Sequence, residues 1–337
     1  MDEITFRAVT PIFYFELLPR GAEYRHSGTF KIVRDGRYIV SLKRYPDEKT
    51  ILDELLQYVD EDARGPLLSI RTHAYIDTDY FLVVDVTYPL TDELRIAGLS
   101  RELDHIHTIC LDVLRLHTSH GIVYHPSYFF HSLPHPNTGR RSLSVRSTPI
   151  TNQYLFSFAV TGPSTLSESE FENCTATLET MLRRNWNDSV TFDKVLTLAL
   201  EYHKTTFILQ RAEHRFLLLM VICDALFKKE NERNASQAAR RISELLSTTQ
   251  SDQPRVQKEF FDRATQSFYR LRNAAAHGDP NLDRDNMETK YWALYHYITK
   301  AIIALISIPD GKLDWTIDYY DEISRYIENR FNGLPPS

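Results

Sequence analysis

A chain of 337 residues, 42% hydrophobic and 25% charged, has the composition of a globular protein and enough length for two domains. Its formal net charge of −6 argues against a protein whose whole surface holds nucleic acid by non-specific positive charge, although a local basic site stays open. Three widely spaced cysteines, with no Cys-x-x-Cys pair, support neither a disulfide framework nor a cysteine zinc site, and they fit a reducing cytosol. We expect a cytoplasmic protein, because no signal peptide is recognised and no apolar run reaches the roughly 20 residues of a membrane span.

Strand and helix signals are mixed in residues 1–162, and we expect an α+β domain there. The clearest signal is Asp35-Gly36, because an Asp-Gly turn between two β-rich runs predicts a hairpin. The predicted strands are 30–33, 38–42, 74–76 (paired with 80–86) and 154–160, and the predicted helices are 48–58 and 102–117.

The turn-forming residues 161–165 separate this domain from a second half in which strand signals nearly vanish. We assign 163–189 to a connecting helix and linker, and 190–332 to an all-α helical bundle. Short polar loops between long helices predict antiparallel packing. The predicted helices are 168–184, 192–210, 213–229 (possible continuation of the one before), 235–247, 255–277, 288–306 and 315–330.

The predicted helix 255–277 carries the most informative residues of the chain. At about 100° per residue, its apolar residues form one stripe that should face the bundle core. Arg272, Asn273 and His277 fall away from that stripe, on a polar face centred on Asn273. An exposed Arg-x4-His pair is by itself usually just solvated. A functional role can therefore be inferred only with the help of the surrounding residues.

Those surroundings add weight to the motif. Tyr269 and Gln266 are predicted to share the polar face, and Ala276 leaves a shallow spot where another surface can approach. Gly278 and Pro280 should end the helix directly after the motif, because glycine suits a left-handed cap and proline cannot continue a helix.

Together with the upstream stretches 198–203 and 215–227, Arg272, Asn273 and His277 resemble a HEPN domain of the Apea-like branch, an all-α bundle with an Arg-x4-6-His signature. The resemblance covers about residues 190–330. Asp224 stands where that branch usually has Glu. The resemblance implies a metal-independent endoribonuclease that needs no cofactor and forms a two-fold homodimer with a composite active site.

The same resemblance assigns the roles. His277 would transfer protons, Arg272 would stabilise charge on the phosphorane, and Asn273 would orient the phosphate or His277. The 2′-OH of the RNA supplies the nucleophile, so no metal is required. Further candidates are Tyr269, Gln266 and Arg270 as substrate-binding or dimer-seam residues, and Asp224 as a brace for Arg272.

By resemblance, such proteins often serve as toxins or anti-phage effectors. Residues 1–162 would then sense a regulatory protein or phage trigger, or restrain the bundle, an inference by elimination. The alternative is a non-catalytic HEPN module that binds RNA, a nucleotide or a protein partner.

Three weaker patterns remain. His117 and His120 with Asp112 or His125 have a conceivable zinc spacing, but helix-end and loop positions favour ordinary histidines. The run 121–126 follows a helix as a kinase catalytic loop would, yet its Asp and Asn are absent and no Lys–Glu pair is placed to help. Two basic stretches can track an RNA backbone or form solvated faces, namely 255–272 and the set Lys228, Lys229, Arg233, Arg240 and Arg241.

Overall fold

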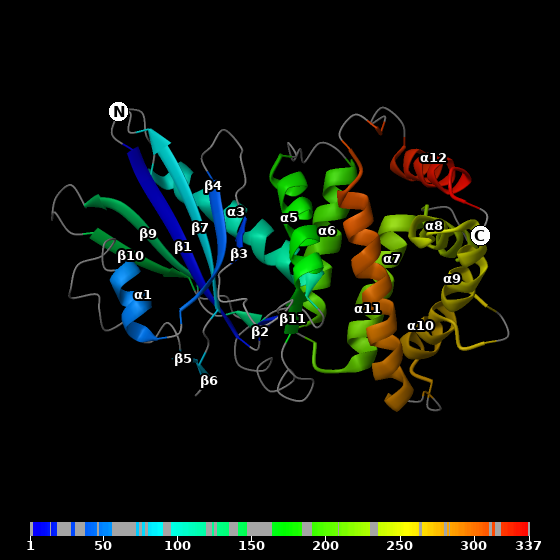
Figure 1. The fold of residues 1–337 in the computed structure, drawn as a ribbon. Helices are drawn as coiled ribbons and strands as arrows, with labels where there is room; N and C mark the ends of the chain where they lie inside the picture. Colours follow the sequence, from blue (N-terminus) through cyan, green and yellow to red (C-terminus); the bar gives the residue numbers. More distant parts are fainter. Residues whose placement is uncertain are drawn as a thin grey trace. The chain divides into compact units, whose positions relative to one another are not determined.

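The chain folds into two compact units, Met1–Arg183 and Arg184–Ser337, which are described separately (Figure 1). The computed structural model describes residues 3–13, 15–18, 28–30, 38–45, 47–55, 72–73, 76–77, 80–89, 96–118, 123–124, 127–134, 141–146, 164–183, 191–207, 209–229, 235–262, 265–279, 282, 284–309, 312–313 and 318–335. The architecture is mixed α+β, with every described strand in the first unit.

An antiparallel sheet in the order β10-β9-β1-β7-β4-β3, with β8 added beside β1, forms the first unit's framework. Its strands are β1 (Glu3–Phe13), β3 (Gly28–Phe30), β4 (Tyr38–Arg44), β7 (Tyr80–Pro89), β8 (Val123–Tyr124), β9 (Ser127–Pro134) and β10 (Arg141–Arg146). Strand β2 (Phe15–Leu18) pairs in parallel with β11 (Ser164–Ser167), and β5 (Thr72–His73) pairs with β6 (Ile76–Asp77). The helices of this unit are α1 (Glu48–Leu55), α3 (Ile96–His117) and α5 (Glu168–Arg183).

Side chains alternate between the two faces of the sheet, one apolar and the other mixed, with buried Val9 and Val83 near Arg7 and Asp85. Phe6 and Ala8 of β1 are buried on the apolar side, and α3 packs against β1 and β7. On the same side the Nε2 of His107 in α3 lies 2.5 Å from the hydroxyl of Thr10. Residues at odd positions, such as Arg7, lie on the opposite face and meet α1.

Several expectations for this unit are corrected. Of the predicted strand 74–76 only Ile76 is described, and it lies in β6, which pairs with β5, whereas β7 pairs with β1 and β4. The predicted helix 168–184 is not a connector, because α5 packs against α3 and belongs to the first unit. Part of the predicted turn 161–165 is strand β11. The hairpin partners β3 and β4 do pair, with Phe30 opposite Val40, whereas the turn 31–37 and the predicted strand 154–160 lie outside the described residues.

The regular elements that the structure describes in the second unit are all helices, as expected. Its elements are α6 (Thr191–Thr206), α7 (Ala212–Phe227), α8 (Ser236–Leu246), the 3-10 helix η4 (Gln250–Asp252), α9 (Gln253–Phe260), α10 (Phe268–Ala276), α11 (Arg284–Ile306) and α12 (Tyr319–Asn332). Helix α7 is the central element, because α6, α8, α10 and α11 all pack against it. Its apolar composition fits that place, and Phe216, Leu219 and Met220 are fully buried.

The predicted helix 255–277 is two helices. α9 ends at Phe260, Phe261 is extended, and α10 begins after Ser267, so the register of the apolar stripe restarts at Phe268. The break brings the rings of Phe260 and Phe268 edge to face, with centroids 5.0 Å apart. Helices α6 and α7 are also separate, since α6 ends at Thr206 and α7 begins at Ala212. Among the helices that the structure describes, none combines the length and apolar character needed to cross a bilayer.

Candidate active site at the end of helix α10

Helix α10 ends in the glycine cap that its sequence predicts. Gly278 has a φ of 65°, and its N–H donates to the carbonyl of Ala275 at 3.2 Å. The N–H of Asp279 donates to the carbonyl of Ala274 at 3.0 Å, which completes a Schellman motif. His277 is the residue directly before this left-handed turn, so the cap fixes the backbone from which its imidazole extends.

The last turn of α10 is open to solvent within its unit. Asn273, Ala276 and His277 are exposed, and so are Arg270 and Gln266. Gln266 lies in the turn before the helix rather than on a helical face, and its Oε1 accepts a hydrogen bond from Asn286 at 2.8 Å. Asn273 and His277 are therefore accessible from solvent within this unit.

Arg272 points toward α7 rather than fully into solvent. Its Nη2 lies 3.3 Å from Oδ2 of Asp224, with the side chains 35% and 20% exposed, respectively. The hydroxyl of Tyr269 donates to Oδ1 of the same carboxylate at 2.7 Å. The polar trio is thus not on one face: Arg272 is braced against α7, while Asn273 and His277 extend outward.

Tyr269 is the clearest correction among the candidate residues. It was expected on the polar face, but it is 4% exposed and packs toward α7 beside Phe268 and Leu271. Helix α7 covers the side of α10 that bears Tyr269, so the buried face of α10 includes Tyr269 as well as Phe268 and Leu271. Within its own unit, its hydroxyl donates to Asp224 and so orients that carboxylate.

Burial controls the chemistry around this brace. It raises the pKa of Tyr269 well above its ordinary value, with further contributions from Cys223 and Asp224. Burial likewise raises the pKa of Cys223 to about 12, and its Sγ lies 3.8 Å from the Tyr269 hydroxyl. Both groups stay protonated near neutral pH, so neither supplies a base or a nucleophile.

The histidines considered for zinc do not gather around a common point where the structure describes them. His117 is buried, its Nε2 lies 2.8 Å from the Thr177 hydroxyl, and burial lowers its pKa to about 4. Asp112 is paired with Arg115 at 2.6 Å. His120 and His125 lie outside the described residues, and within the described part no three potential ligands come together.

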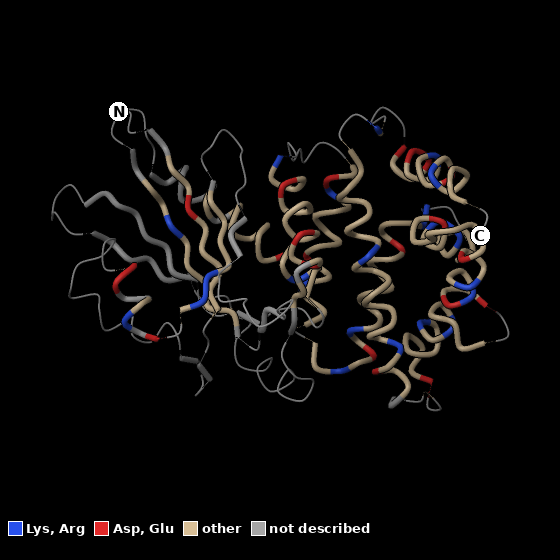
Figure 2. The backbone as a smooth tube through the Cα atoms, viewed as in Figure 1, with Lys and Arg blue, Asp and Glu red and all other residues tan. Residues whose placement is uncertain are grey.

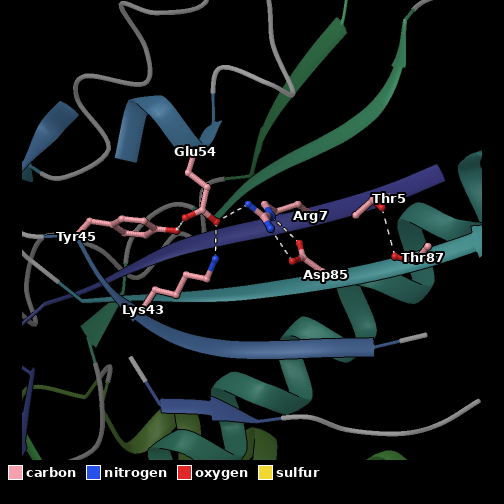
Figure 3. Close-up of polar contacts among 7 residues, drawn as sticks. All are labelled: Thr5, Arg7, Lys43, Tyr45, Glu54, Asp85 and Thr87. Atoms are coloured by element: carbon pink, nitrogen blue, oxygen red, sulfur yellow. Dashed lines mark hydrogen bonds and ion pairs between the residues drawn. The ribbon is translucent and has the colours of Figure 1, made fainter. Parts of the chain in front are cut away.

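A Lys–Glu pair does exist in the first unit, contrary to the sequence analysis. Lys43 of β4 lies 2.5 Å from Oε1 of Glu54 in α1, and the same carboxylate accepts from Arg7 and from the Tyr45 hydroxyl (Figure 3). Arg7 also forms two bonds with Asp85, at 2.5 and 2.7 Å. A sequence signal for this cluster exists: Arg7, Lys43 and Asp85 are charged residues at odd positions of their strands. A search for apolar residues alone does not detect it.

Two members of the second basic set, Lys229 and Arg240, have acidic partners inside the unit. Lys229 lies 2.7 Å from Asp321, and Arg240 lies 2.6 Å from Glu244. Arg241 donates to the carbonyl of Phe227 at 2.6 Å, and Arg233 lies outside the described residues. These contacts favour the structural reading of the set over an RNA track.

Comparisons with protein-family models, with curated proteins and with solved structures find no match to this chain.

Proposed function

We propose that the chain is a metal-independent endoribonuclease of the HEPN type, acting as a toxin or anti-phage effector, with Arg272 and His277 as its catalytic pair. The observation that carries the proposal is the end of α10, where an exposed imidazole follows a guanidinium that a carboxylate holds at 3.3 Å. The all-helical second unit, in which α10 packs on a central apolar helix, is consistent with it.

The chemistry follows from these groups. The imidazole of His277 accepts the 2′-OH proton or protonates the leaving 5′-oxygen, since histidine titrates near neutral pH. The guanidinium of Arg272 presents planar donors to the phosphorane oxygens. Exposed Asn273, one turn before His277, positions the phosphate or the ring.

The reaction needs an acid and a base, but one α10 offers a single histidine for them. We therefore propose a two-fold homodimer in which two copies of α10 face each other, with exposed Ala276 near the axis. Light scattering should give a mass near 79 kDa, twice the 39.3 kDa of the chain. Specific activity should fall on dilution below the dimer dissociation constant, whereas a concentration-independent rate per chain would contradict the composite site.

The direct test is RNA cleavage in EDTA. A labelled single-stranded RNA is incubated with the full chain, with His277→Ala and with His214→Ala, an exposed histidine on α7 that serves as the matched control. We expect chelator-resistant cleavage that falls by about 10²–10⁴ in His277→Ala and is unchanged in His214→Ala. Equal cleavage by both variants would point to a contaminating nuclease and remove the proposal.

One observation favours the alternative of a non-catalytic HEPN module. Arg272 already has a structural partner in Asp224, so the residue is explained without chemistry. In that case Arg272→Ala lowers the free energy of unfolding, and the parent protein binds RNA, a nucleotide or a protein without cleaving it. The proposal of catalysis requires instead that His277→Ala, at an exposed position, abolishes cleavage without loss of stability.

A further inference from the structure

A polar cleft of about 420 Å³ lies in the second unit between α9, the turn before α10 and the first turns of α11. Its lining includes Arg255 and Lys258 from α9, Gln266 from the turn, and Asn286 and Lys290 from α11. These residues are far apart in sequence, and the break between α9 and α10 is what brings them together. The cleft is therefore a product of the fold and not of one amphipathic helix.

The charge of the cleft is positive. Its lining contains three cationic side chains and one carboxylate, Glu259. Lys258 lies 3.8 Å from Asp262, whereas Arg255 and Lys290 form no ion pair with any residue that the structure describes. This differs from the set at Lys229 and Arg240, whose charges are balanced by acidic partners. Figure 2 shows the cationic positions of α9 and the start of α11 in blue.

The remaining lining groups are hydroxyls and amides. Asn286 donates to Oε1 of Gln266, which leaves the amide N–H groups of Gln266 to donate toward a ligand. No aromatic ring and no large aliphatic side chain is among the lining residues. Such a lining matches a phosphate and its sugar, because recognition of a base requires a stacking platform or an apolar wall.

We propose that this cleft binds a backbone phosphate of the single-stranded RNA that the α10 site cleaves, an inference that rests on the proposed function. The cleft adjoins the start of α10 and His277 follows its end, and a nine-residue helix spans about 14 Å. At a rise of about 3.4 Å per stacked nucleotide, that span corresponds to roughly four nucleotides. The substrate is thus an RNA that extends about four nucleotides beyond the scissile bond.

Binding is tested in a His277→Ala background, in which cleavage does not interfere. Fluorescence anisotropy compares a 12-nucleotide and a 4-nucleotide single-stranded RNA on the parent, on Arg255→Ala/Lys290→Ala, and on Lys300→Ala as an exposed lysine further along α11. We expect the double variant to bind the 12-mer about tenfold more weakly and to lower the slope of log affinity against log salt by about 0.7, which is the contribution of one phosphate contact to a single strand. The Lys300→Ala variant should match the parent.

The outcomes separate this inference from the nuclease proposal. If the double variant, shown by thermal melting to be folded, binds the 12-mer as tightly as the parent, the cleft proposal is wrong even when the full chain cleaves RNA. If adenosine 5′-monophosphate binds as tightly as the 12-mer and competes with it, the cleft is a free-nucleotide site and the RNA-track proposal is also wrong. If RNA binding needs Arg255 and Lys290 but the full chain never cleaves, the cleft stands and the nuclease proposal fails.

Discussion

Asp224 and Arg272 form an ion pair that joins the central helix α7 to the helix that carries the candidate active site. The carboxylate uses one oxygen for Arg272 and the other for the hydroxyl of Tyr269. Helix α10 is thus attached to α7 by a polar contact as well as by packing, and the guanidinium has one preferred position.

Asp224 should therefore act as a positioning residue. We expect Asp224→Asn to lower kcat at least tenfold with little change in KM, because a misplaced guanidinium loses transition-state contacts. Stability should fall by about 1 kcal/mol or less, because the pair is partly solvated. Steady-state cleavage assays and urea titrations measure the two effects. Asp224→Glu retains the charge and should recover most of the activity. If its kcat is as low as that of Asp224→Asn, the ion pair does not position Arg272 for catalysis.

Tyr269→Phe isolates one hydrogen bond of the same contact. The variant keeps the buried ring and removes the donor to Asp224, so we expect the free energy of unfolding to fall by about 1 kcal/mol. Chemical denaturation measures this change. Dimer mass should not change, because the residue is buried within its own unit. A loss of dimer without a loss of stability would contradict that placement.

Gly278→Ala tests the left-handed cap that ends α10. A Cβ at this position meets no atom within 4 Å, so the cost arises only from the φ of 65° and should be about 1–2 kcal/mol. Differential scanning calorimetry measures it, and cleavage should fall as His277 moves with the relaxed turn. Gly333→Ala is the matched control, because that glycine has a φ of −83° and any residue adopts it. Equal losses in both variants would show that the left-handed conformation is not the cause.

His117 makes the stability of the first unit depend on pH. Burial lowers its pKa to about 4 from an ordinary 6.5, so the unfolded chain binds a proton in this range that the folded chain does not. The contribution to stability is complete above pH 6.5 and is lost as the pH falls toward 4, by about 3 kcal/mol at most. Urea unfolding at pH 7.5 and pH 5 measures the loss. His117→Gln should flatten this dependence, and His105→Gln, exposed on the same helix, should not.

Like His117, Glu54 loses its contribution to stability as the pH falls, but in a lower range, because its ordinary pKa is 4.5 rather than 6.5. Burial alone would raise the pKa of this carboxyl, but bonds from Lys43 and Tyr45 outweigh burial and lower it. Its stabilising contribution is therefore present above its ordinary pKa and is lost as the pH falls through the lower folded value. We expect Glu54→Gln to lower the free energy of unfolding by about 2 kcal/mol and to speed amide hydrogen exchange in α1. Asp53→Asn, on the exposed side of the same helix, should change neither quantity.

The most accurate predictions were of elements that depend on the local sequence. Helices α5, α7 and α8 were placed within two residues by apolar spacing, and the cap at Gly278 followed from the conformational freedom of glycine. The break between α9 and α10 could not be found in this way, because Phe261 and Ala264 continue the apolar stripe across it. Its cause is tertiary: an extended Phe261 lets Phe260 and Phe268 pack together.

In the candidate site, too, features set by the local sequence were predicted and features set by tertiary packing were not. Exposure of Asn273 and His277 followed from their place in the last turn, and a possible contact of Asp224 with Arg272 was anticipated from a lone acid on an apolar helix. The cleft at Lys290 depends on the helix break, and the burial of Tyr269 depends on the packing of α10 against α7, so both were missed. Strand β1 was missed because its partners, β7 and β9, lie about 80 to 120 residues away.

The parallel pairing of β2 with β11 joins residues 15–18 to residues 164–167. During synthesis, β2 cannot pair until β11 has been made. The synthesis of the residues between them takes roughly 7 to 30 seconds at about 5–20 residues per second. Strand β2 has no partner from β11 in that interval, and we expect the first unit to fold more slowly than the helical second unit.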